Sequence, residues 1–386
     1  MLTASHNPPN YNGIKFNPAD GAPAPQEVTD QIQELANDYF VDPKPVTCPK
    51  PARFHMVNTT SEFCESMLKS ISTHCQFPSP TLSSTSLSVD AKYGSVAKTW
   101  QALSHLFRIH HLYFIHQDPR DDFGGINPNP THLDTLSDLQ TCHAHHQSTI
   151  AVANDPDGDR HVILDESGTP VSPEMISVII LDYLVDKGCP VYGISTTVAS
   201  SSLVKVAAQY HHVEYSETAV GFKFFHSFLK RARHHKKLAL AVESSGGFST
   251  SFHTLEKCGF LPVILILLII QDTGHTLDTL CQHVTARHGQ FYFQECAVEF
   301  EAHLKQPITQ TLPDTQIEDF QLFFDTPIDK LNKKDGAKIL FDNGDWGLIR
   351  LSGTEPVARI YGESQSPDQA AHIIAQLTQF INTLSP

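Results

Sequence analysis

The sequence lacks long apolar runs and a positive net charge, and each absence excludes a class of protein. The longest apolar run, LPVILILLII, spans residues 261–270 and is about half as long as a transmembrane helix. Because 27 Lys and Arg face 42 Asp and Glu, the net charge is −15. This charge argues against general binding to nucleic acids or anionic membranes, but not against a local basic pocket. We therefore expect no nucleic-acid and no membrane partner.

Paired cysteines are also missing. The eight cysteines are scattered without a CxxC pair, which is typical of reduced thiols in the cytosol. No secretory signal pattern stands at the N-terminus, so we expect a cytoplasmic protein. The 23 histidines include several doublets, but none has the spacing to a Cys or a carboxylate that predicts a metal site. We expect most of them, including the doublet His211–His212, on solvated loops and helix faces.

The length and the apolar content predict several domains with sizeable cores. The chain has 386 residues, of which 40% are apolar, and this length suggests two to four domains. Strand-like runs alternate with helix-like runs as far as residue 288, which favours α/β layering. The apolar run at 261–270 is predicted to be a buried helix. From residue 289 on, strand-like runs precede one amphipathic helix, which predicts a small α+β domain.

The first polar loop, TASHNPPNYNGIK, offers a candidate nucleophile. Ser5 lies among small residues, Pro and Gly, so its hydroxyl should be exposed, and a serine can relay a group covalently. Lys15 could move protons or steady negative charge. A Ser beside a His is common by chance, so this loop alone does not establish a catalytic role.

The second polar loop, NDPDGDR, places three carboxylates on alternate residues, Asp155, Asp157 and Asp159. Such a cluster repels itself unless a cation lies within it, and hard oxygen ligands suit Mg²⁺ or Ca²⁺. These residues and Glu166 also match positions of an EF-hand loop, but Arg160 stands where that loop needs Gly and the flanks are strand-like. We therefore favour a metal-binding loop on a β-hairpin, with a solvated acidic turn as the alternative.

Two further loops combine hydroxyl groups with glycine. In AVESSGGF, Glu243 and Ser245 could bind vicinal hydroxyls, although a plain turn fits as well. In RLSGTEPVAR, Arg350, Ser352 and Arg359 surround a turn whose backbone N–H groups could form an anion nest, and arginine suits phosphate. A plain turn is again the alternative. Taken together, the four loops fit phosphoryl transfer on a phosphosugar.

The four loops, in this order, resemble those of the α-D-phosphohexomutases, which comprise phosphoglucomutases, phosphomannomutases and phosphoglucosamine mutases. VDAKYGS and FGGINPNP add support, and the resemblance covers essentially the whole chain. It implies a multi-domain α/β fold: three related α/β units, the first truncated here, and a C-terminal α+β domain around a central cleft. We expect the phosphoserine loop in 1–80, the metal loop in 81–186, the sugar loop in 187–288 and the phosphate loop in 289–386.

The resemblance also implies a role for each matching residue. Ser5 corresponds to the phosphoserine, which Mg²⁺ would bridge to Asp155, Asp157 and Asp159, and Lys15 and Arg160 would assist proton transfer. The implied substrate-binding residues are Gly221, Lys223, Glu243, Ser245, Lys257, Arg350, Ser352, Gly353, Thr354 and Arg359. The implied cofactors are Mg²⁺ and a hexose 1,6-bisphosphate, which is both intermediate and activator. The expected partner is a phosphosugar bound by a monomer or weak dimer.

Some features depart from the family pattern. Only four residues precede Ser5, so we expect most of the first unit to be missing, its serine loop to be poorly supported and apolar faces to be exposed. Cys258 replaces an Asp, and Leu351 replaces a common Pro. ESSGG also lacks the Gly-His ending of glucosamine-type relatives. We expect an isomerase, first of all a phosphoglucomutase. The alternatives are a phosphomannomutase, a phosphoglucosamine mutase or an inactive phosphosugar-binding paralogue.

Overall fold

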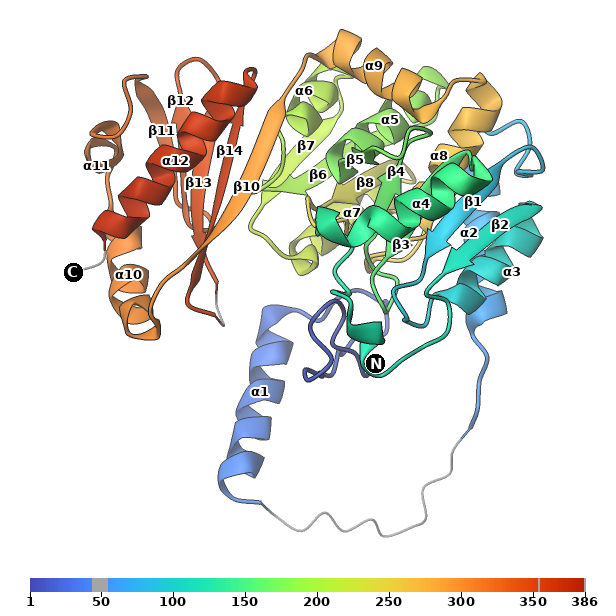
Figure 1. Ribbon diagram of the computed structural model, residues 1–386, viewed down its shortest axis with the longest axis horizontal. Coiled ribbons are helices and arrows are strands. Elements are labelled where there is room, and N and C mark those ends of the chain that lie inside the picture. Colours follow the sequence, from blue (N-terminus) through green and yellow to red (C-terminus); the bar gives the residue numbers. More distant parts are fainter. Residues whose placement is uncertain (44–54, 353–354, 385–386) are drawn as a thin grey trace.

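The computed structural model describes residues 1–43, 55–352 and 355–384 (Figure 1). Gly353 and Thr354, two of the expected phosphate-binding residues, lie outside the described residues. Three sheets organise the described chain. Two of them are mixed sheets within α/β units, and the third is antiparallel.

The first α/β unit contains the sheet with strand order β2-β1-β3-β4-β5. The central strand β1 pairs in parallel with both β2 and β3, whereas β4 returns antiparallel to β3. Helices α2 and α3 pack on each other, and α4 contacts the first three strands. The elements are α2 (Thr60–His74), β1 (Ser86–Asp90), α3 (Ala97–Phe107), β2 (His111–Ile115), α4 (Ser137–His146), β3 (Ile150–Asn154), β4 (His161–Leu164) and β5 (Pro170–Val171).

The second α/β unit repeats this strand pattern in the order β7-β6-β8-β9. Its central strand β6 pairs in parallel with β7 and β8, and β9 returns antiparallel to β8. The two units therefore share one plan, as the sequence predicts for related units. The elements are α5 (Pro173–Asp186), β6 (Val191–Thr197), α6 (Leu203–Tyr210), β7 (Glu214–Thr218), α7 (His226–His234), β8 (Leu238–Val242), β9 (Phe248–Thr250), α8 (Leu261–Thr273) and α9 (Leu277–His288).

The C-terminal α+β domain is an antiparallel sheet of order β10-β14-β13-β12-β11 with α12 on one face (Figure 1). Its own apolar cluster is separate from that of the α/β units. The elements are β10 (Tyr292–Glu299), α10 (Lys305–Thr311), α11 (Ile317–Gln321), β11 (Ile328–Asn332), β12 (Ala337–Phe341), β13 (Trp346–Leu351), β14 (Val357–Ser364) and α12 (Pro367–Thr383).

The N-terminal segment, residues 1–43, is small by comparison. It forms a loop closed by the isolated bridge between Leu2 and Ile14, followed by helix α1 (Gln26–Val41). None of the residues of α1 is buried, and its apolar side chains Leu35 and Phe40 are exposed. The expected exposure of apolar faces is therefore found in this helix, which projects away from the α/β units (Figure 1).

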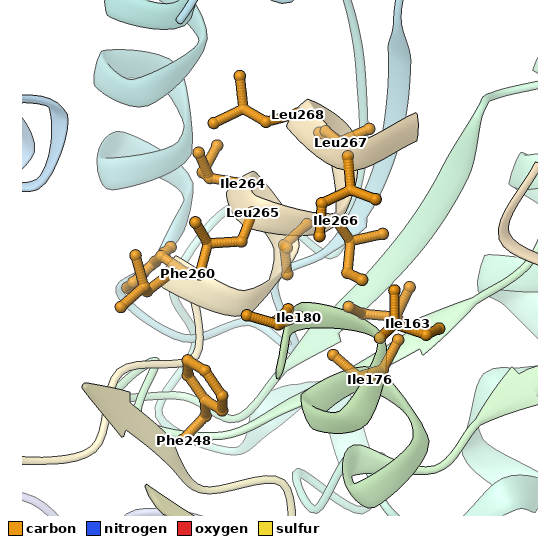
Figure 2. Packing of buried hydrophobic residues seen from close by; sticks show 14 of the residues in the cluster. Ile163, Ile176, Ile180, Phe248, Phe260, Ile264, Leu265, Ile266, Leu267 and Leu268 are labelled. Atoms are coloured by element: carbon orange, nitrogen blue, oxygen red, sulfur yellow. The ribbon is translucent and has the colours of Figure 1, made fainter. Parts of the chain in front are cut away.

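Helix α8 supplies the centre of the main core, as the sequence predicts. Because it is apolar on all sides, it is stable only where protein surrounds it, and every residue from Leu261 to Ile269 is buried. Figure 2 shows this helix packed beside Ile176 and Ile180 of α5, Ile163 of β4 and Phe248 of β9. One apolar cluster thus joins the two α/β units and fixes their sheets relative to each other.

Among the described residues, no single helix is long and apolar enough to cross a membrane, and α8 and α9, bent by 88°, pass the same test only as a pair. The multi-domain α/β fold class is confirmed, with a short first domain. The domain boundaries expected after residues 80, 186 and 288 stay predictions.

Candidate active site

The aspartate loop is a tight β-hairpin connection between β3 and β4. Asp155 and Asp159 are buried and Asp157 is half-buried, and one carboxylate oxygen from each lies within 4.8 Å of the others. Gly158 allows this turn because its φ is +75° and a Cβ there would stand 2.9 Å from the Phe260 ring. Strands flank the loop on both sides, so it is not an EF-hand, whose loop lies between two helices.

The N-terminal loop brings Ser5 onto the aspartates across 150 residues of sequence. Its Oγ donates a 2.8 Å hydrogen bond to Oδ2 of Asp155. Thr3 fixes this approach, because its hydroxyl donates to Oδ2 of Asp157 at 3.0 Å and accepts the backbone N–H of Ser5 at 2.9 Å. Ser5 has a φ of +52°, a left-handed conformation that is uncommon for a non-glycine residue and that these contacts hold in place.

Two lysines balance part of the negative charge of the loop. Nζ of Lys15 lies 2.6 Å from Oδ2 of Asp159 and 3.1 Å from Oδ2 of Asp157, and Nζ of Lys257 lies 3.2 Å from the same Asp159 oxygen. Burial alone would raise the pKa of Asp159, but Lys257, Lys15 and Arg160 outweigh it and hold the pKa well below its usual range. For Asp155 the balance is reversed: burial, Asp159 and Asp157 raise its pKa, and Arg160 opposes the shift without cancelling it.

The residues present fit a hard divalent cation. Among the described residues, Oδ1 of Asp157 and Oδ1 of Asp159 are buried without a hydrogen-bond partner, which is costly unless something positive binds there. Three carboxylates that converge on one point are the donor set that Mg²⁺ and Ca²⁺ prefer. Asp155, Asp157 and Asp159 can therefore hold Mg²⁺ beside the Ser5 hydroxyl.

The loop that follows β8 and contains Glu243 and Ser245, called the sugar loop here, is joined to the aspartate loop by contacts with its backbone. The backbone N–H and the ring Nδ1 of His161 both lie within hydrogen-bond distance of the Gly246 carbonyl oxygen, at 3.1 and 2.7 Å. A Cβ at Gly246 would stand 2.4 Å from the His161 carbonyl oxygen, so only glycine fits. Oε1 of Glu243 accepts the backbone N–H of Gly221 at 3.1 Å, and burial raises the pKa of Glu243 although Lys257 and Arg160 oppose the shift. Gly221, Glu243 and Lys257, three of the expected substrate-binding residues, thus lie in one region of the structure.

The two expected phosphate arginines stand side by side on neighbouring strands. Arg350 of β13 and Arg359 of β14 are directly paired in the antiparallel register. Nε of Arg350 donates to Oδ2 of Asp335 at 2.9 Å, and the same oxygen accepts the backbone N–H of Val220 at 2.8 Å. Asp335 therefore links the arginine to the second α/β unit and orients it.

A cleft of about 810 Å³ joins these groups. The expected residues that line it are Arg160, Gly221, Glu243, Ser245, Lys257, Arg350 and Arg359. Ser5, Lys15 and the aspartates adjoin the cleft through His6 and Arg160, which are part of its wall. Lys223 does not line it, because its ammonium group contacts Oε1 of Gln26 at the start of α1. Ser352 also lies outside the lining, where its hydroxyl accepts the backbone N–H of Glu355.

Sequence reasoning missed several residues at the cleft. His6 lines it, with Nδ1 3.3 Å from Oγ of Ser5, and its position beside the serine was the available signal. Burial, Arg160 and Lys257 lower the pKa of His6 to about 4. Asp335 and two carboxylates in the wall, Glu174 and Glu295, had no local signal, because they reach the site only through packing between domains.

Comparison with known proteins places the chain in a family. Residues 1–40, 61–168 and 172–288 match the models of α/β/α domains I, II and III of phosphoglucomutase/phosphomannomutase. Residues 298–379 match the C-terminal domain of the same family. Together with the fold, these matches define the class of protein: an isomerase of the phosphohexomutase type, with four domains of which domain I is short. The chain belongs to the α-D-phosphohexomutase family.

Individual relatives are similar over most of the chain. A phosphoglucosamine mutase of Limosilactobacillus reuteri is 28% identical over 95% of this chain and 74% of the relative. Phosphoglucomutase 1 of Drosophila melanogaster is 27% identical over 92% of this chain and 71% of the relative. The structure of pp63/parafusin, a phosphoglucomutase from Paramecium, aligns with a TM-score of 0.71 at 22% identity and covers 100% of this chain and 76% of that one. This last likeness concerns the fold.

Proposed function

We propose that this protein interconverts hexose 1-phosphates and hexose 6-phosphates through a phosphoserine at Ser5, with glucose phosphates as the preferred substrates. The observation that carries the proposal is the 2.8 Å contact between the Ser5 hydroxyl and Asp155. With this contact, the proposed nucleophile lies beside a group of three carboxylates that suit Mg²⁺. Within the described residues, Oδ1 of Asp157 and Oδ1 of Asp159 are buried without a hydrogen-bond partner, which suits a bound cation better than a purely structural contact.

The proposed reaction transfers one phosphoryl group from Ser5 to the sugar and then another from the sugar to Ser5. The bond between phosphorus and Oγ of phospho-Ser5 breaks as a sugar hydroxyl oxygen bonds to phosphorus, and in the net reaction the proton of that hydroxyl replaces the phosphoryl group on Oγ. The product is a hexose 1,6-bisphosphate, which turns in the cleft and returns its other phosphoryl group to Ser5. Bound Mg²⁺ would neutralise charge between the phosphoserine and the aspartates.

The chain's own residues divide the remaining work. Arg160 and Lys15 would flank the reacting phosphate. Burial lowers the pKa of Lys15, but Asp159 and Asp157 raise it more strongly, so it ends above its usual range and this group is a cation. As a cation it steadies charge and can donate a proton, but it cannot accept one. Glu243 and Ser245 would accept and donate hydrogen bonds to sugar hydroxyls. Arg350 and Arg359 would hold the phosphate that is not reacting.

Turnover requires space for the intermediate to reorient. The cleft of about 810 Å³ is within the range of small-molecule pockets, and its wall carries groups from both α/β units and the C-terminal domain. A phosphate held at Arg350 and another at Ser5 would therefore exchange places by rotation within one enclosure.

The preference for glucose phosphates rests on the chain itself and on its relatives. ESSGG lacks the Gly-His ending of glucosamine-type relatives, and several relatives are phosphoglucomutases. The phosphoglucosamine mutase among the relatives keeps glucosamine phosphates as a second candidate. The phosphorylation of Ser5, the bisphosphate activator, the cytoplasmic location and the monomeric or weakly dimeric state stay predictions.

A coupled assay tests the proposal. Glucose 1-phosphate with Mg²⁺ and a trace of glucose 1,6-bisphosphate should yield glucose 6-phosphate, and mannose and glucosamine phosphates should react more slowly. Ser5→Ala should abolish turnover, whereas Ser79→Ala, at an exposed loop position, should leave it unchanged. Turnover by Ser5→Ala would remove the phosphoserine from the mechanism. Phosphosugar binding without turnover in the unchanged protein would identify an inactive binding form.

A further inference from the structure

A second group of metal-ligating side chains lies among the helices of the second α/β unit. Asp182 comes from α5, His211 follows the last residue of α6, and His288 ends α9. Ligating atoms of the three lie within 4.8 Å of one another. None of the three lines the cleft of the candidate active site. The sequence predicts most histidines on solvated sites, but the side chains of these two are only 5% and 0% exposed.

The geometry converges on one carboxylate oxygen. Nε2 of His211 lies 2.7 Å from Oδ1 of Asp182, and Nε2 of His288 lies 2.9 Å from the same atom. In a tetrahedral zinc site with metal–ligand distances of about 2.0–2.1 Å, neighbouring ligand atoms are about 3.3 Å apart. Small rotations of the two rings therefore suffice to admit an ion between the three groups.

The surroundings hold the carboxylate in place. Nη1 of Arg287 lies 3.1 Å from Oδ2 of Asp182 and also pairs with Asp186 at 3.0 Å. Oδ2 is thus held by Arg287, although Nε2 of His288 also lies 3.0 Å from it, while Oδ1 faces both imidazoles. Outer partners commonly orient a metal-binding carboxylate in this way. Because Asp186 shares the guanidinium charge, the repulsion that Arg287 would exert on an ion is reduced.

Burial supports an ion more than a plain hydrogen bond. The side chain of His288 is fully buried. Within the part of the chain that the structure describes, its side-chain hydrogen bonds run to Asp182 and its Nδ1 has no partner. Burying an imidazole with one unpartnered nitrogen is costly, and coordination of a metal ion by Nε2 would offset part of that cost.

We propose that Asp182, His211 and His288 form a binding site for a transition-metal dication, Zn²⁺ in particular, that links α5, α6 and α9. Two imidazoles and one carboxylate are typical zinc ligands, whereas Mg²⁺ prefers oxygen alone. The site is separate from the aspartate loop and takes a different ion. Its role is structural: the ion joins three helices whose ends are far apart in the sequence.

Cobalt(II) tests the proposal, because its visible absorption reports coordination. The full chain is stripped with a chelator, Mg²⁺ is added in excess to occupy the aspartate loop, and Co²⁺ is titrated. We expect one equivalent to bind with the intense absorption of a four- or five-coordinate nitrogen and oxygen site, displaced by Zn²⁺. His211→Gln should weaken binding at least tenfold. The matched control is His212→Gln, the exposed other half of the same doublet, which should bind like the unchanged chain.

The contrary results are equally definite. An absorption that is absent, or that is the same in His211→Gln and in the unchanged chain, would overturn the proposal. So would equal losses in His211→Gln and His212→Gln. Should His211→Gln fail to fold, X-ray absorption at the cobalt edge of the unchanged chain decides: two imidazole ligands support the site, and oxygen or sulfur ligands alone refute it.

Discussion

The buried carboxyl of Glu174 should make the stability of this protein fall as the pH rises. Glu174 stands in the first turn of α5 and is 3% exposed. Burial raises its pKa from 4.5 to about 7, with Glu363 and Glu295 adding to the rise and backbone N–H groups, including that of Ser201, opposing it. The folded protein therefore holds this proton over a pH range in which the unfolded chain has released it.

The sign and size follow from linkage. Below about pH 4.5 the carboxyl is neutral in both states and contributes nothing. Between 4.5 and about 7 the folded state binds more protons than the unfolded state, so the free energy of unfolding decreases with pH. Above the folded pKa the full penalty applies, and at ~1.4 kcal/mol per pKa unit it is about 3 kcal/mol.

The assay is urea unfolding of the unchanged chain and of Glu174→Gln, at several values from about pH 5 to about pH 8. Other titrating groups affect both proteins alike, so the difference between them isolates Glu174. We expect Glu174→Gln to gain about 2.5 kcal/mol relative to the unchanged chain over this range, because a small part of the penalty already applies at about pH 5. Glu318→Gln, at an exposed position, is the control and should show no such gain. A difference between Glu174→Gln and the unchanged chain that stays constant with pH would refute the reasoning.

Three further predictions concern the cleft, the core and the sugar loop. Asp335→Asn should free Arg350 and raise KM for the phosphosugar roughly tenfold with a smaller change in kcat, and an unchanged KM would contradict the orienting role. Leu265→Ala, in the buried part of α8, should lower the free energy of unfolding by about 3–5 kcal/mol in urea melts, and a loss below 1 kcal/mol would mean that the site collapses without a cavity. Gly246→Ala should lose both stability and turnover because its Cβ meets backbone at 2.4 Å, whereas Gly274→Ala, with a similar positive φ but open space, should lose only the ~1 kcal/mol of conformational strain. Equal losses in thermal melts of the two glycine variants would contradict a collision at Gly246.

The parts of the site that the sequence predicts are those whose chemistry is local. The aspartate loop alternates its carboxylates within five residues, and a strand-loop-strand context is enough to place them on one turn. The buried helix α8 was likewise predictable, because a run without any polar face has to be surrounded by protein. Such features depend on residues that are close in the sequence, and contacts with distant residues contribute little to them.

The parts that were not predictable depend on contacts between distant residues. Asp335 orients Arg350 and contacts the backbone of Val220, which belongs to another domain. Lys223 lies in a motif that the family resemblance assigns to the sugar, yet its long side chain reaches Gln26 of α1. A four-carbon side chain can point in several directions, and its motif does not determine which one packing selects.

The histidine cluster explains why spacing rules fail for some metal sites. Rules such as two ligands a few residues apart describe sites on one turn or one helix. Here His211 and His288 are 29 and 106 residues from Asp182, and each stands at or just beyond the C-terminal end of its own helix. Helix ends converge wherever helices pack around a common apolar centre, and α5, α6 and α9 do so around the cluster that contains α8. The same core that fixes the sheets thus brings these three ligands together. A search for metal sites should therefore compare the residues at the ends of packed helices, because sequence distance there carries no information about spatial distance.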